Sequence, residues 1–495
     1  MDKIKFGTDG WRGVIGDDFT FANVRRVAAA IAEYVKAESE LSRGLIVGYD
    51  TRFLSAECAQ AAAEVVAGSG IRVTLADRPT PTPAISYAVV SRQAAGAIVV
   101  TASHNPYRWN GIKFKAAYGG SAAPAITGRI ERHLQRLDRA TARRPRGRPR
   151  QGKSALRPNT VSQDPVGTGR RSGATAAGQY IETADLIAPY LGRLKSMIHL
   201  ESILASGQQF VLDPMYGTAR GCIARLFQEA GIPHNEIHAE HNPLFPGLNP
   251  EPIEPHVSDL RGAVLDGQCD AGFATDGDAD RLGAIDRDGT FIDSHKIFSI
   301  LLKHLVEDRG QRGEVVKTFS TTRMIDKLAR KYDLPLHITP IGFKYICELM
   351  LQHDILIGGE ESGGIGIKGH LPERDGILNS LLLAEVMAEK KSTLGELVQE
   401  LSEEFGSHCY DRVDLEIERP AIERVMREVK QLQSFAGHRI TSTDDLDGFK
   451  MLFGDSAWLL VRASGTENLL RLYAEAPSRQ EVMGLLDTIV SLARK

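Results

Sequence analysis

The sequence predicts an α/β protein of several domains, and three observations support this class. At 495 residues the chain is too long for one hydrophobic core and corresponds to roughly three domains of about 150 residues. Apolar strands alternate with helix-length segments along most of the chain, which predicts layered α/β units with mostly parallel strand pairing. The C-terminal stretch instead carries two strands followed by one helix, which predicts a smaller α+β domain.

The first α/β unit has four expected elements. Residues 45–50 (LIVGYD) are nearly all apolar and indicate a buried strand, and the alanine-rich run 56–67 indicates a helix. Two further segments, 71–75 and 95–100, predict the next two strands. The predicted order of elements in this unit is therefore strand, helix, strand, strand.

The same alternation of strand and helix occurs twice more before the C-terminal unit, so we expect three similar α/β domains and one α+β domain. The later elements are strand 210–213 with helix 217–230, strand 313–319 with helix 322–331, and strands 457–461 and 469–476 with helix 479–493. The expected domains are I (1–190), II (191–290), III (291–408) and IV (409–495).

Composition and charge exclude several classes of protein. Hydrophobic residues make up 42% and charged residues 25% of the chain, which excludes a mainly disordered or fibrous protein. A formal net charge of −3 favours neither nucleic acid nor a membrane as partner, and no apolar run approaches the ~20 residues that span a bilayer. The start MDKIKFGTDGWRG resembles no secretory signal, and the five cysteines are scattered. We therefore expect a cytoplasmic protein with reduced cysteines.

The segment Arg136–Gly178 departs from this pattern. It holds ten Arg and one Lys against two acidic residues, with no aromatic side chain and many Gly, Pro, Ser and Thr. Such a composition cannot bury enough apolar area to offset its ordering entropy, so it predicts a disordered tract that follows a helix over 125–137. It is either a genuine surface insertion or a local reading-frame error, with the frame error slightly favoured. Without interleaved aromatic residues, nucleic-acid binding is not expected there.

Two motifs could carry chemistry directly. Thr101–Pro106 (TASHNP) follows the strand 95–100, so Ser103 would sit in a loop at a strand's carboxyl end, with His104 or Lys113 as proton-transfer partner. A turn serine beside a surface histidine remains an alternative on these six residues alone. In Asp276–Arg281 (DGDADR), carboxylates at alternate positions converge on one side, which favours Mg²⁺ or Mn²⁺. An EF-hand is excluded because Arg281 and Arg287 stand where that loop needs Gly and Glu.

Two further motifs suit a sugar phosphate. In Gly358–Gly364 (GGEESGG), Glu360 and Ser362 offer groups that hydrogen-bond sugar hydroxyls, although a flexible acidic turn would look the same. In Arg462–Asn468 (RASGTEN), hydroxyls, backbone N–H groups and guanidinium groups predict a phosphate cradle, with a capped surface turn as alternative.

In their order and spacing, these four motifs resemble the α-D-phosphohexomutase superfamily, which has a phosphoserine loop, a metal loop, a sugar loop and a phosphate loop. The opening Phe6–Gly13 (FGTDGWRG) is similar to the N-terminal signature of that superfamily. The resemblance covers nearly the whole chain apart from the Arg-rich segment. It implies three similar α/β domains with mixed sheets and a smaller α+β domain around a central cleft.

The resemblance also implies roles for individual residues. Ser103 would be phosphorylated in the resting enzyme, and its phosphate would bind Mg²⁺ together with Asp276, Asp278 and Asp280. The residues expected around the transferring phosphoryl group are Arg12, His104, Lys113 and Arg281, with Lys344 in the loop TPIGFK as a candidate acid/base. Glu360 and Ser362 would bind the sugar, and the remaining phosphate would be held by Arg462, Ser464, Gly465, Thr466 and Arg471.

The implied activity is a phosphohexomutase that interconverts glucose 1-phosphate and glucose 6-phosphate, with Mg²⁺ as cofactor and glucose 1,6-bisphosphate as activator. The GEES form of the sugar loop looks more like phosphoglucomutases than the GEMSGH form of dual-specificity enzymes. A phosphomannomutase or a dual enzyme is the alternative within this class, and an inactive phosphosugar-binding protein is the alternative outside it. The expected partner is a hexose phosphate, and the expected state is a monomer or small homo-oligomer.

Overall fold

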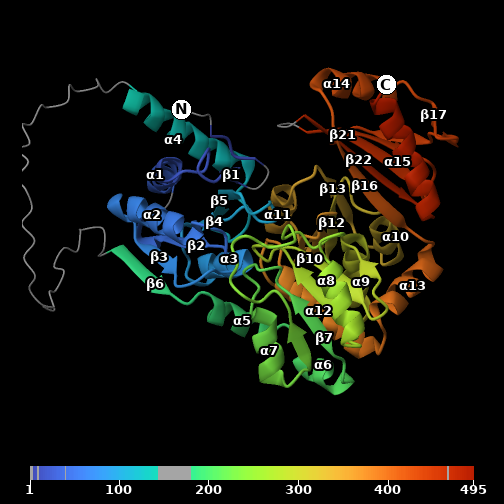
Figure 1. Ribbon diagram of the computed structural model, residues 1–495, viewed down its shortest axis with the longest axis horizontal. Helices are drawn as coiled ribbons and strands as arrows, with labels where there is room; N and C mark the ends of the chain where they lie inside the picture. The colour runs from blue at the N-terminus through green and yellow to red at the C-terminus, as the bar shows by residue number, and fades with distance from the viewer. Residues whose placement is uncertain (1–3, 8–9, 39–40, 143–179, 465–467) are drawn as a thin grey trace, which may run out of the picture.

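The computed structural model places three α/β domains and one α+β domain in the order that the sequence predicts. The structure describes residues 4–7, 10–38, 41–142, 180–464 and 468–495. Domains I and IV lie on opposite sides of the molecule, with domains II and III between them (Figure 1). The predicted α/β class, with three similar domains and a smaller C-terminal one, is confirmed.

Domain I is a six-stranded mixed sheet in the order β1-β5-β4-β2-β3-β6. Its strands are β1 (Trp11–Val14), β2 (Leu45–Tyr49), β3 (Val73–Ala76), β4 (Gly96–Val100), β5 (Trp109–Ala116) and β6 (Ile181–Ala184), and its helices are α1 (Phe21–Glu38), α2 (Ser55–Gly68), α3 (Thr82–Ser91) and α4 (Pro124–Ala142). β2 pairs in parallel with β3 and β4, whereas β5 runs antiparallel to β4. The strands predicted at 45–50 and 95–100 therefore lie side by side and end at the same edge of the sheet.

Helix α4 corrects part of the prediction for the Arg-rich segment. Residues 136–142 continue this helix instead of starting an irregular tract. The physical reason is tertiary contact: Leu137 packs against the domain I core, and Arg26 on α1 forms two hydrogen bonds with Asp138, at 3.0 and 2.7 Å. The rest of the predicted tract, residues 143–178, lies outside the described residues.

Domain II has a five-stranded sheet in the order β11-β10-β9-β7-β8. Its elements are α5 (Ile187–Lys195), α6 (Leu200–Ser206), β7 (Phe210–Asp213), α7 (Cys222–Ala230), β8 (His234–Glu236), α8 (Ser258–Asp266), β9 (Ala271–Thr275), β10 (Leu282–Asp286) and β11 (Phe291–Ile292). The helix expected over 217–230 begins only at Cys222, after a turn in which Gly221 has a φ of 70°.

Domain III has a four-stranded sheet in the order β13-β12-β14-β15. Its elements are α9 (Ser294–Glu307), β12 (Glu314–Thr318), α10 (Met324–Lys331), β13 (Leu336–Thr339), α11 (Phe343–Gln352), β14 (Ile355–Gly359), β15 (Ile365–Ile367), α12 (Gly376–Lys390) and α13 (Leu394–Phe405). One continuous apolar core joins domains II and III, because α12 is buried along most of its length and packs against both. These two domains thus share one hydrophobic core.

Domain IV has an antiparallel five-stranded sheet in the order β16-β22-β21-β20-β19 and its own core. Its elements are β16 (Cys409–Glu416), α14 (Arg419–Val429), β17 (Ser434–Phe435), β18 (His438–Arg439), β19 (Ser442–Asp444), β20 (Phe449–Leu452), β21 (Trp458–Ala463), β22 (Leu469–Ala476) and α15 (Arg479–Ala493). The two strands and the final helix that the sequence predicts here are confirmed.

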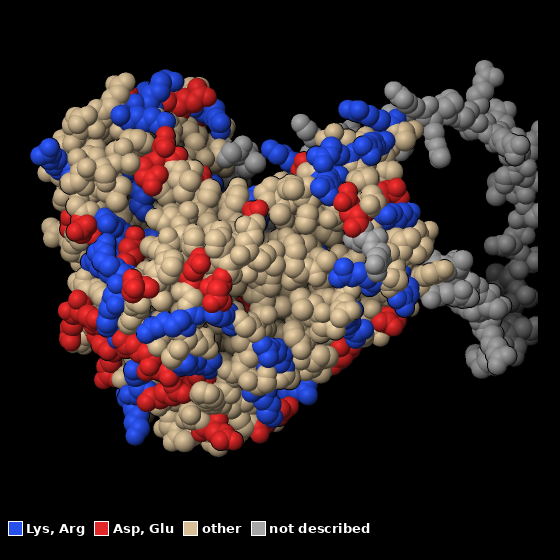
Figure 2. Space-filling model, turned by 180° about the vertical axis from the view of Figure 1, so that it is seen from behind, with Lys and Arg blue, Asp and Glu red and all other residues tan. Residues whose placement is uncertain are grey.

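The surface carries charges of both signs. Figure 2 shows Lys and Arg interspersed with Asp and Glu over the visible face, as expected for a nearly neutral chain. Among the described residues, no helix combines the length and the apolar character that crossing a membrane requires.

Candidate active site

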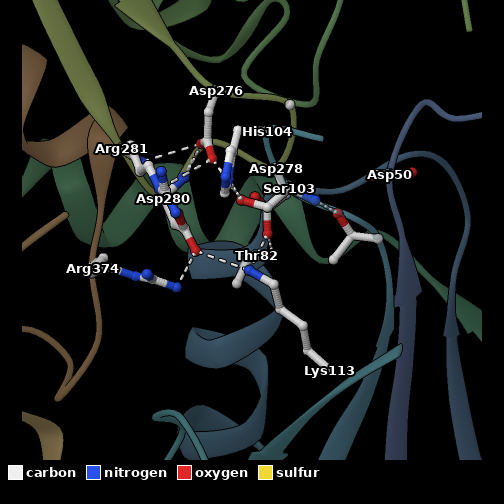
Figure 3. A network of polar contacts seen from close by, with 12 residues as sticks. Asp50, Thr82, Ser103, His104, Lys113, Asp276, Asp278, Asp280, Arg281 and Arg374 are labelled. Carbon is white, nitrogen blue, oxygen red and sulfur yellow. Dashed lines mark hydrogen bonds and ion pairs between the residues drawn. The ribbon is translucent and has the colours of Figure 1, made fainter. Parts of the chain in front are cut away.

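The loop after β4 and the loop after β9 meet at one point (Figure 3). Ser103 is buried in a left-handed conformation with a φ of 55°, and its Oγ donates a hydrogen bond to Oδ2 of Asp276 at 2.8 Å. The two loops approach so closely that position 277 requires a glycine. A Cβ on Gly277 would lie 2.6 Å from the carbonyl oxygen of Ser103. The TASHNP and DGDADR motifs therefore form one site.

Asp276, Asp278 and Asp280 form a buried acidic triad. One carboxylate oxygen from each lies within 4.8 Å of the others. Asp278 Oδ1 and Asp280 Oδ1 are buried and have no hydrogen-bond partner among the described residues. Buried carboxylate oxygens without donors are costly unless a cation binds them, and hard oxygen donors are the ligands that Mg²⁺ prefers. The residues present therefore fit a divalent cation.

The electrostatics of the triad differ from residue to residue. Burial, followed by the charges of Asp280 and Asp278, raises the pKa of Asp276 well above its usual value. Burial would also raise the pKa of Asp278, but the adjacent Lys113 ammonium lowers it below its usual range. Lys113 Nζ donates to Asp278 Oδ2 at 2.8 Å and to Asp280 Oδ2 at 3.1 Å. Lys113 thus offsets part of the negative charge of Asp278 and Asp280.

His104 lies beside Ser103, with Nδ1 3.4 Å from the serine Oγ. Burial, and after it the charges of Arg281, Arg12 and Lys113, lower the pKa of His104 well below its usual value. The imidazole is therefore neutral at physiological pH and can accept a proton from a hydroxyl group. The structure thus places this candidate proton-transfer partner beside the serine hydroxyl.

Arg281 and Arg12 border the same site. Arg281 Nε lies 3.8 Å from Asp276 Oδ2 and 3.9 Å from Asp280 Oδ1. Arg12 is on β1, which pairs with β5, and its Nη1 donates to Oδ1 of Asn105 in the serine loop. The N-terminal motif thus reaches the serine loop although the two are far apart in the sequence, as expected for paired strands of one sheet.

Arg52 is a buried residue of this site that the sequence analysis missed. Its Nη2 donates to the carbonyl oxygens of Ser103 and Asn105, both at 2.6 Å, and its Nη1 donates to those of Pro106 and Trp109. Its Nε lies 3.1 Å from Asp50 Oδ2, and the guanidinium carbon lies 5.0 Å from the centre of the Phe245 ring of domain II. Arg52 therefore holds the backbone of the serine loop. A signal was available, since Asp50 and Arg52 also follow a strand's carboxyl end.

Arg374 is the second residue that was missed. Its Nη2 donates to Asp280 Oδ2 at 2.7 Å, and its Nη1 lies 3.4 Å from Glu360 Oε2, so it joins the metal loop to the sugar loop. A Cβ on Gly364 would lie 2.1 Å from Arg374 Cδ, so the glycine leaves space for this arginine. Arg374 differs from an ordinary loop arginine only in being buried. The sequence does not reveal burial, so it could not single out this residue.

The predicted sugar loop follows β14. Glu360 is buried, while Ser362 is partly exposed. Lys344 is at the start of α11, next to Phe343, whose ring centre lies 5.5 Å from the Arg374 guanidinium carbon. The structure therefore brings Glu360 to the acidic triad through Arg374, and it places Lys344 on a neighbouring element.

The predicted phosphate loop lies in domain IV, between β21 and β22. Arg462 and Arg471 are directly opposite each other on these strands. Arg462 Nε donates to Asp447 Oδ1 at 2.9 Å, and Arg471 Nε lies 3.9 Å from Asp414 Oδ2. Ser464 is buried and accepts a hydrogen bond at its carbonyl oxygen from Arg419. Gly465 and Thr466 lie outside the described residues.

Four family profiles match the chain in succession. They are described as phosphoglucomutase/phosphomannomutase α/β/α domain I (residues 3–141), domain II (188–289), domain III (293–405) and C-terminal domain (416–492). Together they cover most of the chain and leave out residues 142–187, which include most of the Arg-rich segment.

Similar proteins carry names from the same family but with different substrates. A Thermococcus kodakarensis phosphoglucomutase/phosphomannomutase is 28% identical over 99% of this chain and 98% of its own length. A Limosilactobacillus fermentum phosphoglucosamine mutase is 30% identical, covering 100% and 98%. A solved Thermus thermophilus protein, provisionally described as a phosphomannomutase, has a TM-score of 0.82 and 34% identity, and the match covers 100% of both chains.

Proposed function

Because the chain belongs to the phosphoglucomutase/phosphomannomutase family, we propose that this mutase interconverts glucose 1-phosphate and glucose 6-phosphate through a phosphoserine at position 103. The observation that carries the proposal is the buried contact of Ser103 Oγ with Asp276 inside the acidic triad. A hydroxyl among cationic groups and metal-binding carboxylates is suited to phosphoryl transfer, which needs alignment and charge neutralisation more than covalent assistance.

In the first half-reaction, the Ser103 phosphate is transferred to the free hydroxyl of a hexose phosphate, which gives a hexose 1,6-bisphosphate. In the second, the other phosphate of the bisphosphate returns to Ser103. Lys113 and Arg281 stabilise the negative charge of the transferring group, and neutral His104 can hold the hydroxyl proton. Mg²⁺ bound by Asp276, Asp278 and Asp280 would supply further positive charge. Glucose 1,6-bisphosphate would act as activator because it phosphorylates a free Ser103.

The phosphate that is not transferred would bind at Arg462, Ser464, Gly465, Thr466 and Arg471. A cradle on a separate domain can hold the phosphate of either the 1- or the 6-position while the other end of the sugar faces Ser103. Glu360 and Ser362, with Lys344 as candidate acid/base, would contact the sugar between the two phosphate sites.

A phosphoglucosamine mutase is the second candidate, since a full-length relative at 30% identity has that name. Phosphomannomutase activity is the third, by likeness to the Thermus protein. A coupled assay of the purified protein with the 1-phosphates of glucose, glucosamine and mannose separates these candidates. We expect the highest kcat/KM for glucose 1-phosphate, and a tenfold preference for either other sugar would reassign the substrate.

The sugar loop gives a second test. Glu360→Gln or Ser362→Ala should raise KM and lower kcat for glucose phosphates and still allow bisphosphate to phosphorylate Ser103, which mass spectrometry can detect. Wild-type kinetics of both variants on all three sugars would refute the role of this loop. If the wild-type protein took up no phosphoryl group and turned over none of the sugars, it would be a phosphosugar-binding protein instead of a mutase.

A further inference from the structure

Glu314, His337 and His353 form a cluster in domain III on the opposite end of the sheet from the sugar loop. Glu314 begins β12, whereas the sugar loop follows the carboxyl end of the neighbouring parallel strand β14. His337 is on the edge strand β13, and His353 is the residue after α11. The cluster therefore draws on three separate elements and is not part of the phosphoryl-transfer site.

Strand register explains why the first two side chains meet. His337 is the partner of Val316, and Glu314 is two residues before Val316, so Glu314 and His337 are on the same face of the sheet. α11 covers that face, because Val316 packs with Ile346 and Cys347 of this helix. His353 at the end of α11 is thereby brought to the same place.

The three side chains converge on one carboxylate oxygen. Glu314 Oε2 lies 2.5 Å from His337 Nε2 and 3.1 Å from His353 Nδ1, and the ligand atoms all lie within 4.8 Å of one another. A tetrahedral metal with bonds of about 2.0–2.1 Å holds neighbouring ligand atoms about 3.3 Å apart. Small side-chain shifts would therefore give this geometry without movement of the backbone.

Charge and access also suit a metal ion. Among the described residues, Glu314 forms ion pairs with these two histidines and with no Lys or Arg. The site is open to solvent, since the side chains retain 27%, 31% and 38% of their exposure for Glu314, His337 and His353. By contrast, the cluster around His304 already has Arg309 and Lys390 as fixed cations.

We propose that Glu314, His337 and His353 bind a transition-metal ion, preferably Zn²⁺, with water as fourth ligand. Two imidazole nitrogens and one carboxylate form a donor set that zinc binds well and that Mg²⁺, which requires oxygen ligands, does not. The ion fastens the edge strand β13 and the end of α11 to β12. It thus acts on domain III stability, separately from the cation at the acidic triad.

Cobalt substitution tests this site with saturating Mg²⁺ present to occupy the oxygen-only triad. One equivalent of Co²⁺ should give intense visible absorption bands, because tetrahedral Co²⁺ with nitrogen ligands absorbs far more strongly than octahedral Co²⁺ with oxygen ligands. Zn²⁺ should displace it and raise the temperature of unfolding by about 2–4 °C.

His337→Ala and His353→Ala should each lower the Co²⁺ affinity at least tenfold, while His241→Ala, which removes an exposed histidine in domain II, should not. His353 follows the last residue of its helix, so its variant should fold even if His337→Ala does not, and glucose 1-phosphate turnover in Mg²⁺ checks folding. Bands that persist in both variants, or a wild-type protein without bands, would overturn the proposal.

Discussion

The proposed phosphoserine centre and the proposed phosphate loop of domain IV use similar charged residues in opposite ways. At the centre, Ser103, the three aspartates, Lys113 and Arg374 are all buried and connected by hydrogen bonds. In domain IV, the side chains of Arg462 and Arg471 retain 16% and 33% of their exposure, and each lies near one carboxylate at the protein surface.

This difference in burial suggests that the Ser103 centre carries out the chemical step and that the domain IV loop serves binding. A transition state is stabilised by groups that are already fixed in place, and burial and hydrogen bonds hold the side chains of the centre. In the proposed reaction the distal phosphate is bound in two orientations of the substrate, which partly exposed arginines on a separate domain permit. Substitutions at the centre should therefore lower kcat, and substitutions in domain IV should act mainly on KM.

Ser103→Ala should produce the largest effect, a loss of at least about 10⁴-fold in kcat with a folded protein, because both half-reactions pass through this oxygen. Turnover of glucose 1-phosphate and circular dichroism are the measurements. Turnover near the wild-type rate would show that Ser103 is not the phosphocarrier. The proposed division of roles between the two regions would then be wrong.

Removal of divalent metal should inactivate the enzyme almost as completely. The buried oxygens Asp278 Oδ1 and Asp280 Oδ1 lack donors among the residues that the structure describes, and without a cation the triad repels a phosphoryl group. Mg²⁺ should restore activity after chelation, while Zn²⁺ should substitute poorly because the ligands are all oxygen. Full activity in excess chelator after dialysis would contradict the role of the triad.

Arg52→Lys should lower kcat about 10- to 100-fold with little change in KM, since a lysine cannot hold four carbonyl groups of the serine loop at once. The matched control is Arg43→Lys, because Arg43 also donates to backbone carbonyl groups but on the surface of domain I. An equal change in both variants would mean that Arg52 has only a general structural role.

Arg462→Gln should raise KM about tenfold and change kcat less, because the pair to Asp447 is partly exposed and the proposed role of this arginine is to bind the distal phosphate. Steady-state kinetics in both directions provide the measurement. If kcat fell as steeply as in Arg52→Lys while KM stayed constant, domain IV would take part in the chemical step.

Lys450→Met should leave turnover unchanged and alter the stability of the protein by an amount that depends on pH. Lys450 is buried at the boundary of domains III and IV, where Nζ donates to the Phe319 carbonyl group at 2.8 Å. Burial, with a smaller contribution from Lys317, lowers its pKa to about 7, while the unfolded chain keeps a value of about 10.4.

Between these two values the folded protein binds fewer protons than the unfolded chain at this lysine, so the wild-type protein gains stability as the pH rises from about 7 to about 10. Lys450→Met lacks this gain. Its stability relative to wild type should therefore be greatest near pH 7 and fall by up to about 1.4 kcal/mol per pH unit above it, as urea unfolding at pH 7, 8 and 9 would measure. A difference that does not vary with pH would place the lysine pKa near its ordinary value.

Local sequence determined much of this protein. Strand and helix periodicity predicts β2 and β4, and the polar motifs in the loops between apolar segments identify Ser103 and the acidic triad, because strand ends in parallel sheets expose their loops at a common edge. The expectation failed where a contact far along the chain decides the outcome: α4 continues to Ala142 because Leu137 and Asp138 contact the rest of domain I.

Tertiary structure alone decided which charged residues are buried together. Arg52 and Arg374 look like ordinary charged loop residues in the sequence, yet one holds the serine loop and the other joins Asp280 to Glu360. The sequence determines the order of loops because periodicity is local. The pairing of buried charges depends on distances between segments that lie far apart in the chain, which only the packed domains set.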